Sequence, residues 1–310
     1  MTAGLAAIRY ALPAATATLD ELEAEGLLVT PRATLEGWGF RRIHRATDES
    51  AFDLAVRAAS ALLDEEKIDP ASIDVVLYAS ALPDPARRGR DPLALFRYPA
   101  TRLQIELGLH EATVTAVAQS GCASMFAAVA IARDRLAADP GARRILCVGS
   151  DVLPAGSRRE ILYNVVSDGA CAVLVERDAP NRIVSYVQRT KGFYWSPKER
   201  TRELIATYFP TAKRVVEEAL ARSSVSKDDL ALVLPHNVSE RSWEILLDLL
   251  GIPPEKLWRA NIAAKGHTIA ADPFMNLRDA IDAGALHRGD KALLFTFGFG
   301  AHWAAIVVEH

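Results

Sequence analysis

The sequence predicts an α/β protein made of two similar halves that pack face to face. Segments with apolar residues at helical spacing alternate with continuous apolar strands, a pattern typical of sheets covered on both faces by helices. The second part of the chain also repeats the pattern of the first. A repeat of this kind predicts a pseudo-two-fold arrangement, with a functional site at the joint where loops of both halves converge.

The repeat starts with two predicted helices, at residues 52–63 and 209–220. Phe52 and Phe209 occupy equivalent positions in these helices, as do Leu63 and Leu220, so the two share one constant offset. Paired apolar strands follow the helices at 73–78 and 230–235, at 144–149 and 291–298, and at 172–176 and 305–309. We therefore predict an N-terminal half over 1–178 and a C-terminal half over 179–310, with the boundary region near 178–198.

The composition excludes several classes of protein. The 310 residues are 50% hydrophobic and 24% charged, with a net charge of −3. This balance is ordinary for a globular protein and lacks the basic excess of a nucleic-acid-binding surface. The sequence shows no run of about 18 apolar residues and no signal-peptide pattern, and its three cysteines form no disulfide framework. We expect a cytoplasmic protein with no nucleic-acid or membrane partner, and we assign no metal site.

Cys122 is the candidate nucleophile. The stretch 113–117 reads as a strand, 119–121 as a turn, and a long apolar helix follows from Cys122. Free backbone N–H groups at a helix start favour a thiolate there, and the N–H of Cys122 could help to stabilise an oxyanion. Cys147 and Cys171 lie inside apolar strand patterns and should be buried. The alternative is that Cys122 is only a small residue at a tight helix start.

Two histidines fall where loops should meet this cysteine. His236 follows the last apolar residue of a strand, a position that suits a general base facing a crevice. His267 lies in a turn before a helix that starts near Pro273, and Asp272 is a plausible N-cap of that helix. Each of these residues also has a purely structural alternative.

A Gly-rich turn at 297–301 separates the last two predicted strands. The backbone N–H groups of Phe299 and Gly300 could complete an oxyanion hole with that of Cys122. His302 lies next to this turn and is either a pocket residue or, as we favour, a structural one. The basic run at 87–90 is either solvated surface or a contact for a phosphate-bearing carrier or coenzyme.

Taken together, several of these motifs resemble β-ketoacyl-acyl-carrier-protein synthase III. The resemblance runs from about residue 5 to the C-terminus and rests on Gly121-Cys122-Ala123, Val148-Gly149-Ser150-Asp151, Ser167-Asp168-Gly169-Ala170, Pro235-His236-Asn237, Gly266-His267-Thr268 and Phe297-Gly298-Phe299-Gly300. It implies the thiolase fold, with two pseudo-two-fold-related halves in α-β-α-β-α layers, and a homodimer. It also implies an acyl thioester on Cys122, loaded from an acyl-CoA or an acyl carrier protein. Coenzyme A or phosphopantetheine would enter only as part of the substrate, with no permanently bound cofactor.

The departures from that family are as informative as the matches. Condensing members carry asparagine where this chain has His267, and there the asparagine and the strand-end histidine donate hydrogen bonds to the malonyl thioester carbonyl. A histidine near Asp272 instead suggests a base for an incoming hydroxyl or amine. The loop at 83–99 also looks longer than in condensing members. These features make the chain resemble acyltransferases of natural-product pathways.

We therefore expect an acyltransferase of secondary metabolism that uses Cys122 as nucleophile and His236 as general base. Asp272 or His267 would orient His236 or the acceptor, which is a small molecule or a carrier-bound group. Two alternatives stay open. One is decarboxylative condensation of the acyl group with a malonyl thioester, and the other is a partner subunit without chemistry of its own.

Overall fold

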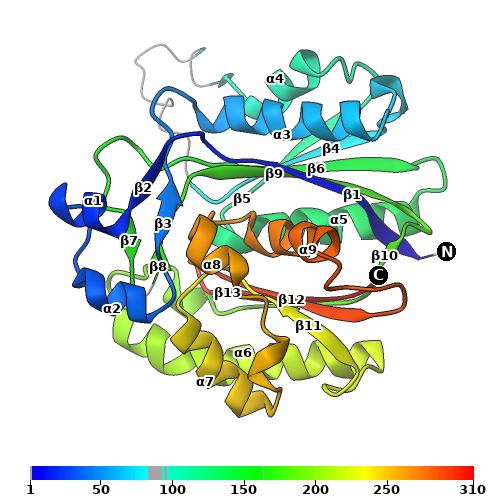
Figure 1. Cartoon of the computed structure of the whole chain (residues 1–310). Helices are drawn as coiled ribbons and strands as arrows, with labels where there is room; N and C mark the ends of the chain where they lie inside the picture. Colours follow the sequence, from blue (N-terminus) through cyan, green and yellow to red (C-terminus); the bar gives the residue numbers. More distant parts are fainter. Residues whose placement is uncertain (1, 83–92, 94–95, 163) are drawn as a thin grey trace.

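A computed structural model of the chain describes residues 2–82, 93, 96–162 and 164–310. The basic run at 87–90 and most of the long loop at 83–99 lie outside these residues. Within them, nine strands form one sheet in the order β11-β12-β13-β10-β1-β9-β6-β4-β5. The sheet does not lie in one plane. The strands of the N-terminal half form one layer and those at the C-terminal end of the sheet form another (Figure 1).

The N-terminal half contributes five of the strands. They are β1 (Ala3–Ala11), β4 (Val75–Ser80), β5 (Thr113–Ala118), β6 (Arg144–Asp151) and β9 (Gly169–Arg177). Strand β4 is parallel to both β5 and β6, whereas β9 is antiparallel to both β6 and β1. The helices of this half are α3 (Ala51–Glu65), α4 (Pro99–Glu106) and α5 (Ser124–Ala138).

The C-terminal half repeats this plan. Its strands are β10 (Asn181–Thr190), β11 (Leu230–Leu234), β12 (Lys291–Gly298) and β13 (His302–Glu309), and its main helices are α6 (Thr201–Ser223), α7 (Glu240–Leu250) and α9 (Asp272–Asp282). Strand β11 is parallel to β12, and β13 is antiparallel to both β12 and β10. In place of a counterpart of β5, strand β11 makes a single parallel bridge, between Val233 and Leu257. The predicted repeat is therefore confirmed for β4, β6 and β9, whose counterparts are β11, β12 and β13.

The two halves meet along β1 and β10. These first strands pair antiparallel, with Gly4 opposite Arg182 and Leu5 opposite Asn181. The predicted division at residue 178 falls in the connection between β9 and β10. Part of the predicted boundary region, 178–198, is thus not a linker but the strand β10, which opens the second half.

Figure 1 shows five layers, with α3 and α4 on one outer face, α6 and α7 on the other, and α5 and α9 between the sheet portions. Three apolar clusters fill the spaces between them. Helix α5 is suited to the middle because buried side chains lie around its circumference, among them Met125, Phe126, Val129 and Leu136. The predicted fold class and α-β-α-β-α layering are confirmed.

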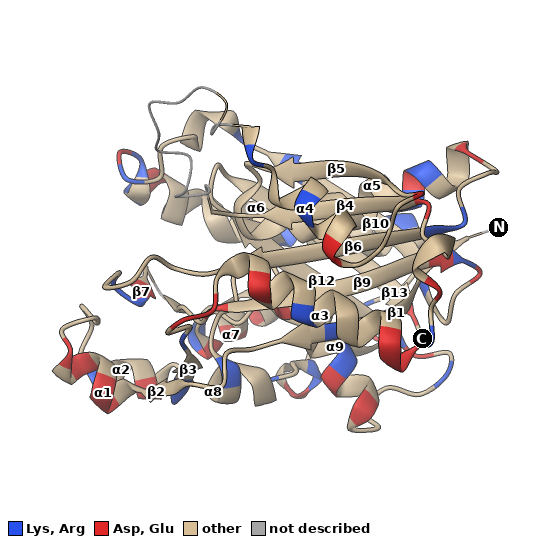
Figure 2. Ribbon diagram, turned by 90° about the horizontal axis from the view of Figure 1, so that it is seen from above, with Lys and Arg blue, Asp and Glu red and all other residues tan. Residues whose placement is uncertain are grey.

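Smaller elements extend from one end of the layers. They are β2 (Thr16–Thr18), α1 (Leu19–Ala24), α2 (Arg32–Gly37), β3 (Arg42–His44), β7 (Glu160–Ile161), β8 (Asn164–Val165) and α8 (Ala260–Lys265). Figure 2 shows acidic and basic residues interspersed along the surface elements. Among the described residues, no helix is long and apolar enough to span a bilayer.

The middle layer depends on a contact between its two helices. The rings of Phe126 on α5 and Phe274 on α9 lie 5.3 Å apart and both are fully buried. Phe126→Ala should lower the free energy of unfolding by about 3–5 kcal/mol, because it leaves a cavity between the layers. Denaturant titration measures this loss. On the same helix, Ile131 is 44% exposed, so Ile131→Ala should cost less than about 1 kcal/mol; equal losses would contradict the layered packing.

Candidate active site

Cys122 lies in a tight turn between β5 and α5. Gln119 and Gly121 both have positive φ, at 66° and 54°, so the chain reverses sharply after the strand. A 3-10 turn over Gly121–Ala123 follows, closed by the hydrogen bond from the Ala123 N–H to the Ser120 carbonyl. The helix was predicted from Cys122 but begins at Ser124. Cys122 therefore precedes the first turn of α5, and it is 8% exposed.

This turn packs directly against the end of β12. A Cβ atom added to Gly298 would lie 2.0 Å from the Ser120 carbonyl oxygen, and one added to Gly121 would lie 2.6 Å from the Phe299 nitrogen. Only glycine permits such an approach of two backbones. It brings the N–H of Phe299 beside the Cys122 turn. The predicted oxyanion hole of Cys122, Phe299 and Gly300 is thus built from adjoining segments, although its action on a substrate stays a prediction.

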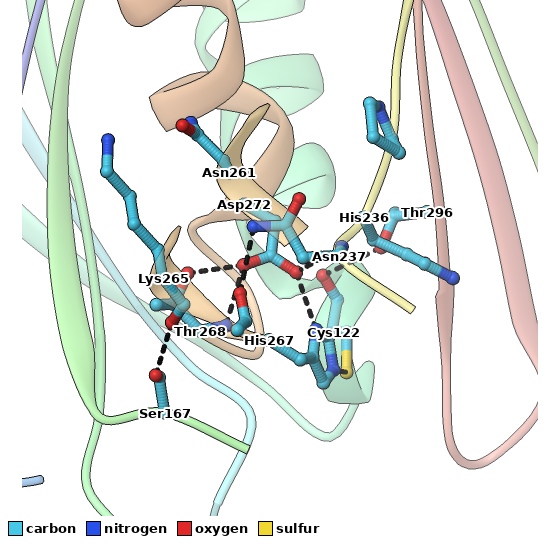
Figure 3. A network of polar contacts seen from close by, with 12 residues as sticks. Cys122, Ser167, His236, Asn237, Asn261, Lys265, His267, Thr268, Asp272 and Thr296 are labelled. Carbon is cyan, nitrogen blue, oxygen red and sulfur yellow. Dashed lines mark hydrogen bonds and ion pairs between the residues drawn. The ribbon is translucent and has the colours of Figure 1, made fainter. Parts of the chain in front are cut away.

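The sulfur of Cys122 faces His267, and His267 faces Asp272 (Figure 3). The distance from Cys122 Sγ to His267 Nε2 is 3.5 Å, and that from His267 Nδ1 to Asp272 Oδ2 is 2.5 Å. All three side chains are buried, Asp272 completely. A nucleophile, an imidazole and a carboxylate in this order form a triad of the kind that can move one proton at the sulfur.

Asp272 accepts more than the imidazole. Its Oδ2 also accepts the N–H of Asn237 at 2.7 Å, and its Oδ1 accepts the N–H of Thr268 at 2.6 Å and the Thr268 hydroxyl. The prediction that Asp272 is the N-cap of its helix is wrong. Ala271 is the N-cap and Asp272 the first helical residue, and both carboxylate oxygens are taken by groups of preceding loops.

Two backbone hydrogen bonds hold His267 in place. Its N–H donates to the Val165 carbonyl at 2.9 Å, and its carbonyl accepts the N–H of Ser167 at 2.8 Å. The residue thus pairs as a short parallel bridge with the segment that follows β8. The backbone of His267 is held by the N-terminal half of the chain, and its imidazole is held by Asp272. Both contacts limit the positions that the ring can adopt.

The electrostatics of His267 follow from these neighbours. Burial alone would lower its pKa, but the charges of Asp272 and Cys122 outweigh burial and raise the pKa to about 10. The imidazole is therefore protonated below that pH. A bond formed at the Cys122 sulfur would remove one of the two charges that raise the pKa of His267.

His236 has a different environment from the one predicted. The Phe297 N–H donates to its Nδ1 at 2.9 Å, and the Trp243 indole N–H donates to its carbonyl at 3.0 Å. Burial and the nearby His267 hold the pKa of His236 well below its usual value. The ring is thus neutral with its proton on Nε2, so this nitrogen is a hydrogen-bond donor and not a base, and it lies 3.5 Å from the hydroxyl oxygen of Tyr208.

The predicted roles of His236 need correction on these grounds. Its Nδ1 lone pair accepts the Phe297 N–H, an arrangement that leaves no free basic nitrogen for the general-base role that the sequence led us to expect. Asp272 contacts His267 rather than His236, and the two imidazole rings lie 5.9 Å apart. The structure brings His236 to the site but orients it through Phe297 and Trp243.

Sequence reasoning missed the amides behind Asp272. Asn237 donates from its side chain to the Gly266 carbonyl at 2.9 Å and accepts from Asn276 at 2.9 Å. Asn276 also donates to the Pro235 carbonyl and accepts from Asn261. These contacts join the loops that carry His236 and His267. Only one feature of the sequence could have pointed to these amides, the position of Asn237 directly after the candidate His236.

The remaining candidates have structural surroundings. His302 Nδ1 lies 2.9 Å from the Thr190 hydroxyl on β10, which fits the structural role we favoured. Cys147 and Cys171 are fully buried on β6 and β9, as predicted, and burial raises the pKa of both thiols. Neither can compete with Cys122 as a nucleophile.

Two family models match this chain. Residues 118–192 match 3-oxoacyl-[acyl-carrier-protein] synthase III, and residues 220–310 match the C-terminal domain of the same synthase. The synonymous β-ketoacyl-[acyl-carrier-protein] synthase III of Aquifex aeolicus is 26% identical over 287 residues, which cover 88% of each chain. That of Methylococcus capsulatus is 26% identical over 325 residues, covering 96% of each.

Solved structures share the fold. The 3-oxoacyl-[acyl-carrier-protein] synthase III of A. aeolicus has a TM-score of 0.85 at 23% identity and covers 99% of this chain and 100% of its own. ChlB3, an acyltransferase, has a TM-score of 0.87 at 21% identity, with 100% and 98% covered. AbyA1, a tetronic acid condensing enzyme, has a TM-score of 0.82 at 24% identity and covers both chains fully.

The charge on His267 can be followed directly by nuclear magnetic resonance. In the wild-type protein the ring should stay protonated as the pH rises and lose its proton near pH 10. Asp272→Asn removes the carboxylate charge that raises this pKa, so the midpoint should fall by at least one pH unit, to about 9 or below. Asp290→Asn, which removes a carboxylate paired with His287, should leave it unchanged. An unaltered midpoint in Asp272→Asn would contradict the assigned ion pair.

Proposed function

This chain belongs to the 3-oxoacyl-[acyl-carrier-protein] synthase III family, and from that premise we propose that it is an acyltransferase acting through Cys122. The acyl group would come from an acyl-CoA or an acyl carrier protein. It would pass to the hydroxyl or amine of an acceptor rather than to a malonyl thioester. The observation that carries this proposal is the contact of Cys122 with a histidine that is itself paired with a buried carboxylate.

In the first step the Cys122 sulfur attacks the carbonyl carbon of the donor thioester. The bond to the donor sulfur then breaks, and coenzyme A or the carrier thiol leaves with that electron pair. Backbone N–H groups of Cys122 and of the Phe299-Gly300 turn would hold the oxyanion between these events. His267 would give its Nε2 proton to the leaving thiolate, because the negative charge on Cys122 that retained this proton has been consumed.

In the second step the neutral His267 would act as the base. Its Nε2 takes the proton of the acceptor hydroxyl or amine as the acceptor attacks the thioester carbonyl, and Cys122 leaves as thiolate. Asp272 stabilises the imidazolium that forms and fixes the tautomer that presents Nε2 to the site. Cys122 ends the cycle as thiolate and His267 as imidazolium, which are their starting charges. One turnover would therefore need no cofactor beyond the pantetheine arm of the substrate.

The surroundings of Cys122 suit an apolar acyl group. Leu153, Val166 and Ile269 are buried around the sulfur, with Leu82 and Ile161 packed against them. An acyl chain placed among these side chains would be removed from water without leaving polar groups unpaired. We propose on this basis that the donor carries an aliphatic or aromatic acyl group rather than a charged one.

Decarboxylative condensation is the second candidate. It is favoured by the synthase names of the curated relatives and by the neutral His236, whose Nε2–H is a donor of the kind an enolate requires. Loading of Cys122 would use the His267–Asp272 pair in both candidates, whereas only transfer to a hydroxyl or amine would also need a base in the second step. A predicted homodimer, an acyl carrier partner, a role in secondary metabolism and a cytoplasmic location stay predictions with either candidate.

The acyl-enzyme can be detected by intact-mass spectrometry. Incubation with acetyl-CoA, butyryl-CoA or benzoyl-CoA should add one acyl mass to the wild-type chain, because the paired Cys122 is the reactive thiol. Cys122→Ala should add none, whereas Cys147→Ala, which removes a buried strand cysteine, should load like wild type. Loading of Cys122→Ala equal to wild type would exclude the proposed nucleophile.

The fate of the loaded acyl group separates the two candidates. If the enzyme is an acyltransferase, the loaded enzyme should keep its acyl group when malonyl-CoA is added. It should release less than about 0.1 molecule of carbon dioxide per acyl-enzyme within several minutes. Radiolabel in the malonyl carboxylate measures this release, and intact mass measures the retained acyl group. One carbon dioxide per acyl group consumed would instead establish condensation.

A further inference from the structure

Tyr208 is a residue of the site that no sequence motif singled out. It lies on α6, with its ring 5.0 Å from that of Phe209 and 5.2 Å from that of Phe297, both in edge contacts. Its hydroxyl oxygen is 3.5 Å from His236 Nε2. Burial and the charge of Cys122 raise the pKa of Tyr208, so the phenol remains neutral beside the nucleophile.

The direction of the contact with His236 follows from the other ring nitrogen. Because the Phe297 N–H donates to Nδ1 at 2.9 Å, the proton of the neutral ring must lie on Nε2. Nε2–H therefore points at the Tyr208 oxygen, which accepts it. The single polar hydrogen of the His236 ring is occupied by a residue of the protein itself.

This matters for the reaction that follows loading. Decarboxylation of a malonyl thioester breaks the bond between the carboxylate and the α-carbon, and carbon dioxide leaves. The electron pair of that bond becomes an enolate, whose oxygen needs a hydrogen-bond donor in a dry site. His267 Nε2 is directed at the Cys122 sulfur and Nδ1 at Asp272, so the free donor would have to be His236 Nε2–H.

We propose that Tyr208 determines which reaction this enzyme performs. Its hydroxyl occupies His236 Nε2–H and so withholds the donor that an enolate would need, leaving transfer to a hydroxyl or amine as the outcome. This inference rests on the proposed acyl transfer and adds to it a residue that sets its specificity. Tyr208 acts here through His236, as a positioning residue.

Release of labelled carbon dioxide from carboxyl-labelled malonyl-CoA tests the inference, with the enzyme first loaded from acetyl-CoA. Tyr208→Phe keeps the ring contacts but frees Nε2–H, so release should rise about tenfold or more over wild type, the effect of one hydrogen bond to a charged oxygen. Tyr208→Ala should also raise it. Tyr186→Phe is the matched control, since it removes a half-buried hydroxyl that bonds Gln188 on β10, and should leave release unchanged.

A rate in Tyr208→Phe that equals the rate in Tyr186→Phe would overturn the inference and leave the proposed function intact. Wild-type release of one carbon dioxide per acyl group would instead overturn the proposed function and the inference with it. A second measurement does not depend on malonyl-CoA. The ¹⁵N resonance of His236 Nε2 should move in Tyr208→Phe and stay in Tyr186→Phe, and an unmoved resonance would contradict the contact.

Discussion

The site depends on one buried carboxylate. Asp272 has no exposed surface, and an ionised group taken out of water must be paired and hydrogen-bonded to be tolerated. Its partners come from two loops of the C-terminal half, the backbone at Asn237 and the turn that holds His267 and Thr268. The same charge therefore organises the loops and raises the pKa of His267. Folding and the electrostatics of the site are coupled here, because the carboxylate that must be paired on burial also raises the pKa of His267.

Cys122 is linked to this carboxylate, through His267, only because the two halves close on each other. Cys122 comes from the N-terminal half, on a turn that rests against Gly298 of β12. His267 comes from the C-terminal half, but its backbone pairs with Val165 and Ser167 of the first. Thr296, also on β12, donates its hydroxyl to the Cys122 carbonyl. Small shifts between the halves would therefore change the distance from sulfur to imidazole.

Much of this could be predicted from the sequence, because it depends on local patterns. The repeat of helix and strand over residues 52–78 and 209–235 gave the two halves, and a turn followed by an apolar helix gave Cys122. The Gly-rich turn beside Phe299 was recognisable from its composition. These features are encoded within about 30 residues of chain, where periodicity and turn chemistry act directly.

The pairing within the site could not be predicted in this way. Cys122 and His267 are 145 residues apart, and nothing local distinguishes the histidine that faces the sulfur from the one that does not. The tautomer of His236 is set by the Phe297 N–H, a backbone contact that any residue except proline could make at position 297. Tyr208 reads as an ordinary aromatic of an amphipathic helix. Asp272 looked like an N-cap because both roles place a carboxylate before a helical proline.

The central claim is that His267, and not His236, moves the proton at Cys122. It is tested most directly by preparing acetyl-Cys122 enzyme, removing excess acetyl-CoA and following release of the acetyl group to hydroxylamine in a single turnover by intact mass. We expect His267→Ala to slow this release about 10²–10⁴-fold, as for loss of a general base, and His236→Ala to slow it less than about tenfold. Slow release from His236→Ala with near-normal release from His267→Ala would contradict the claim.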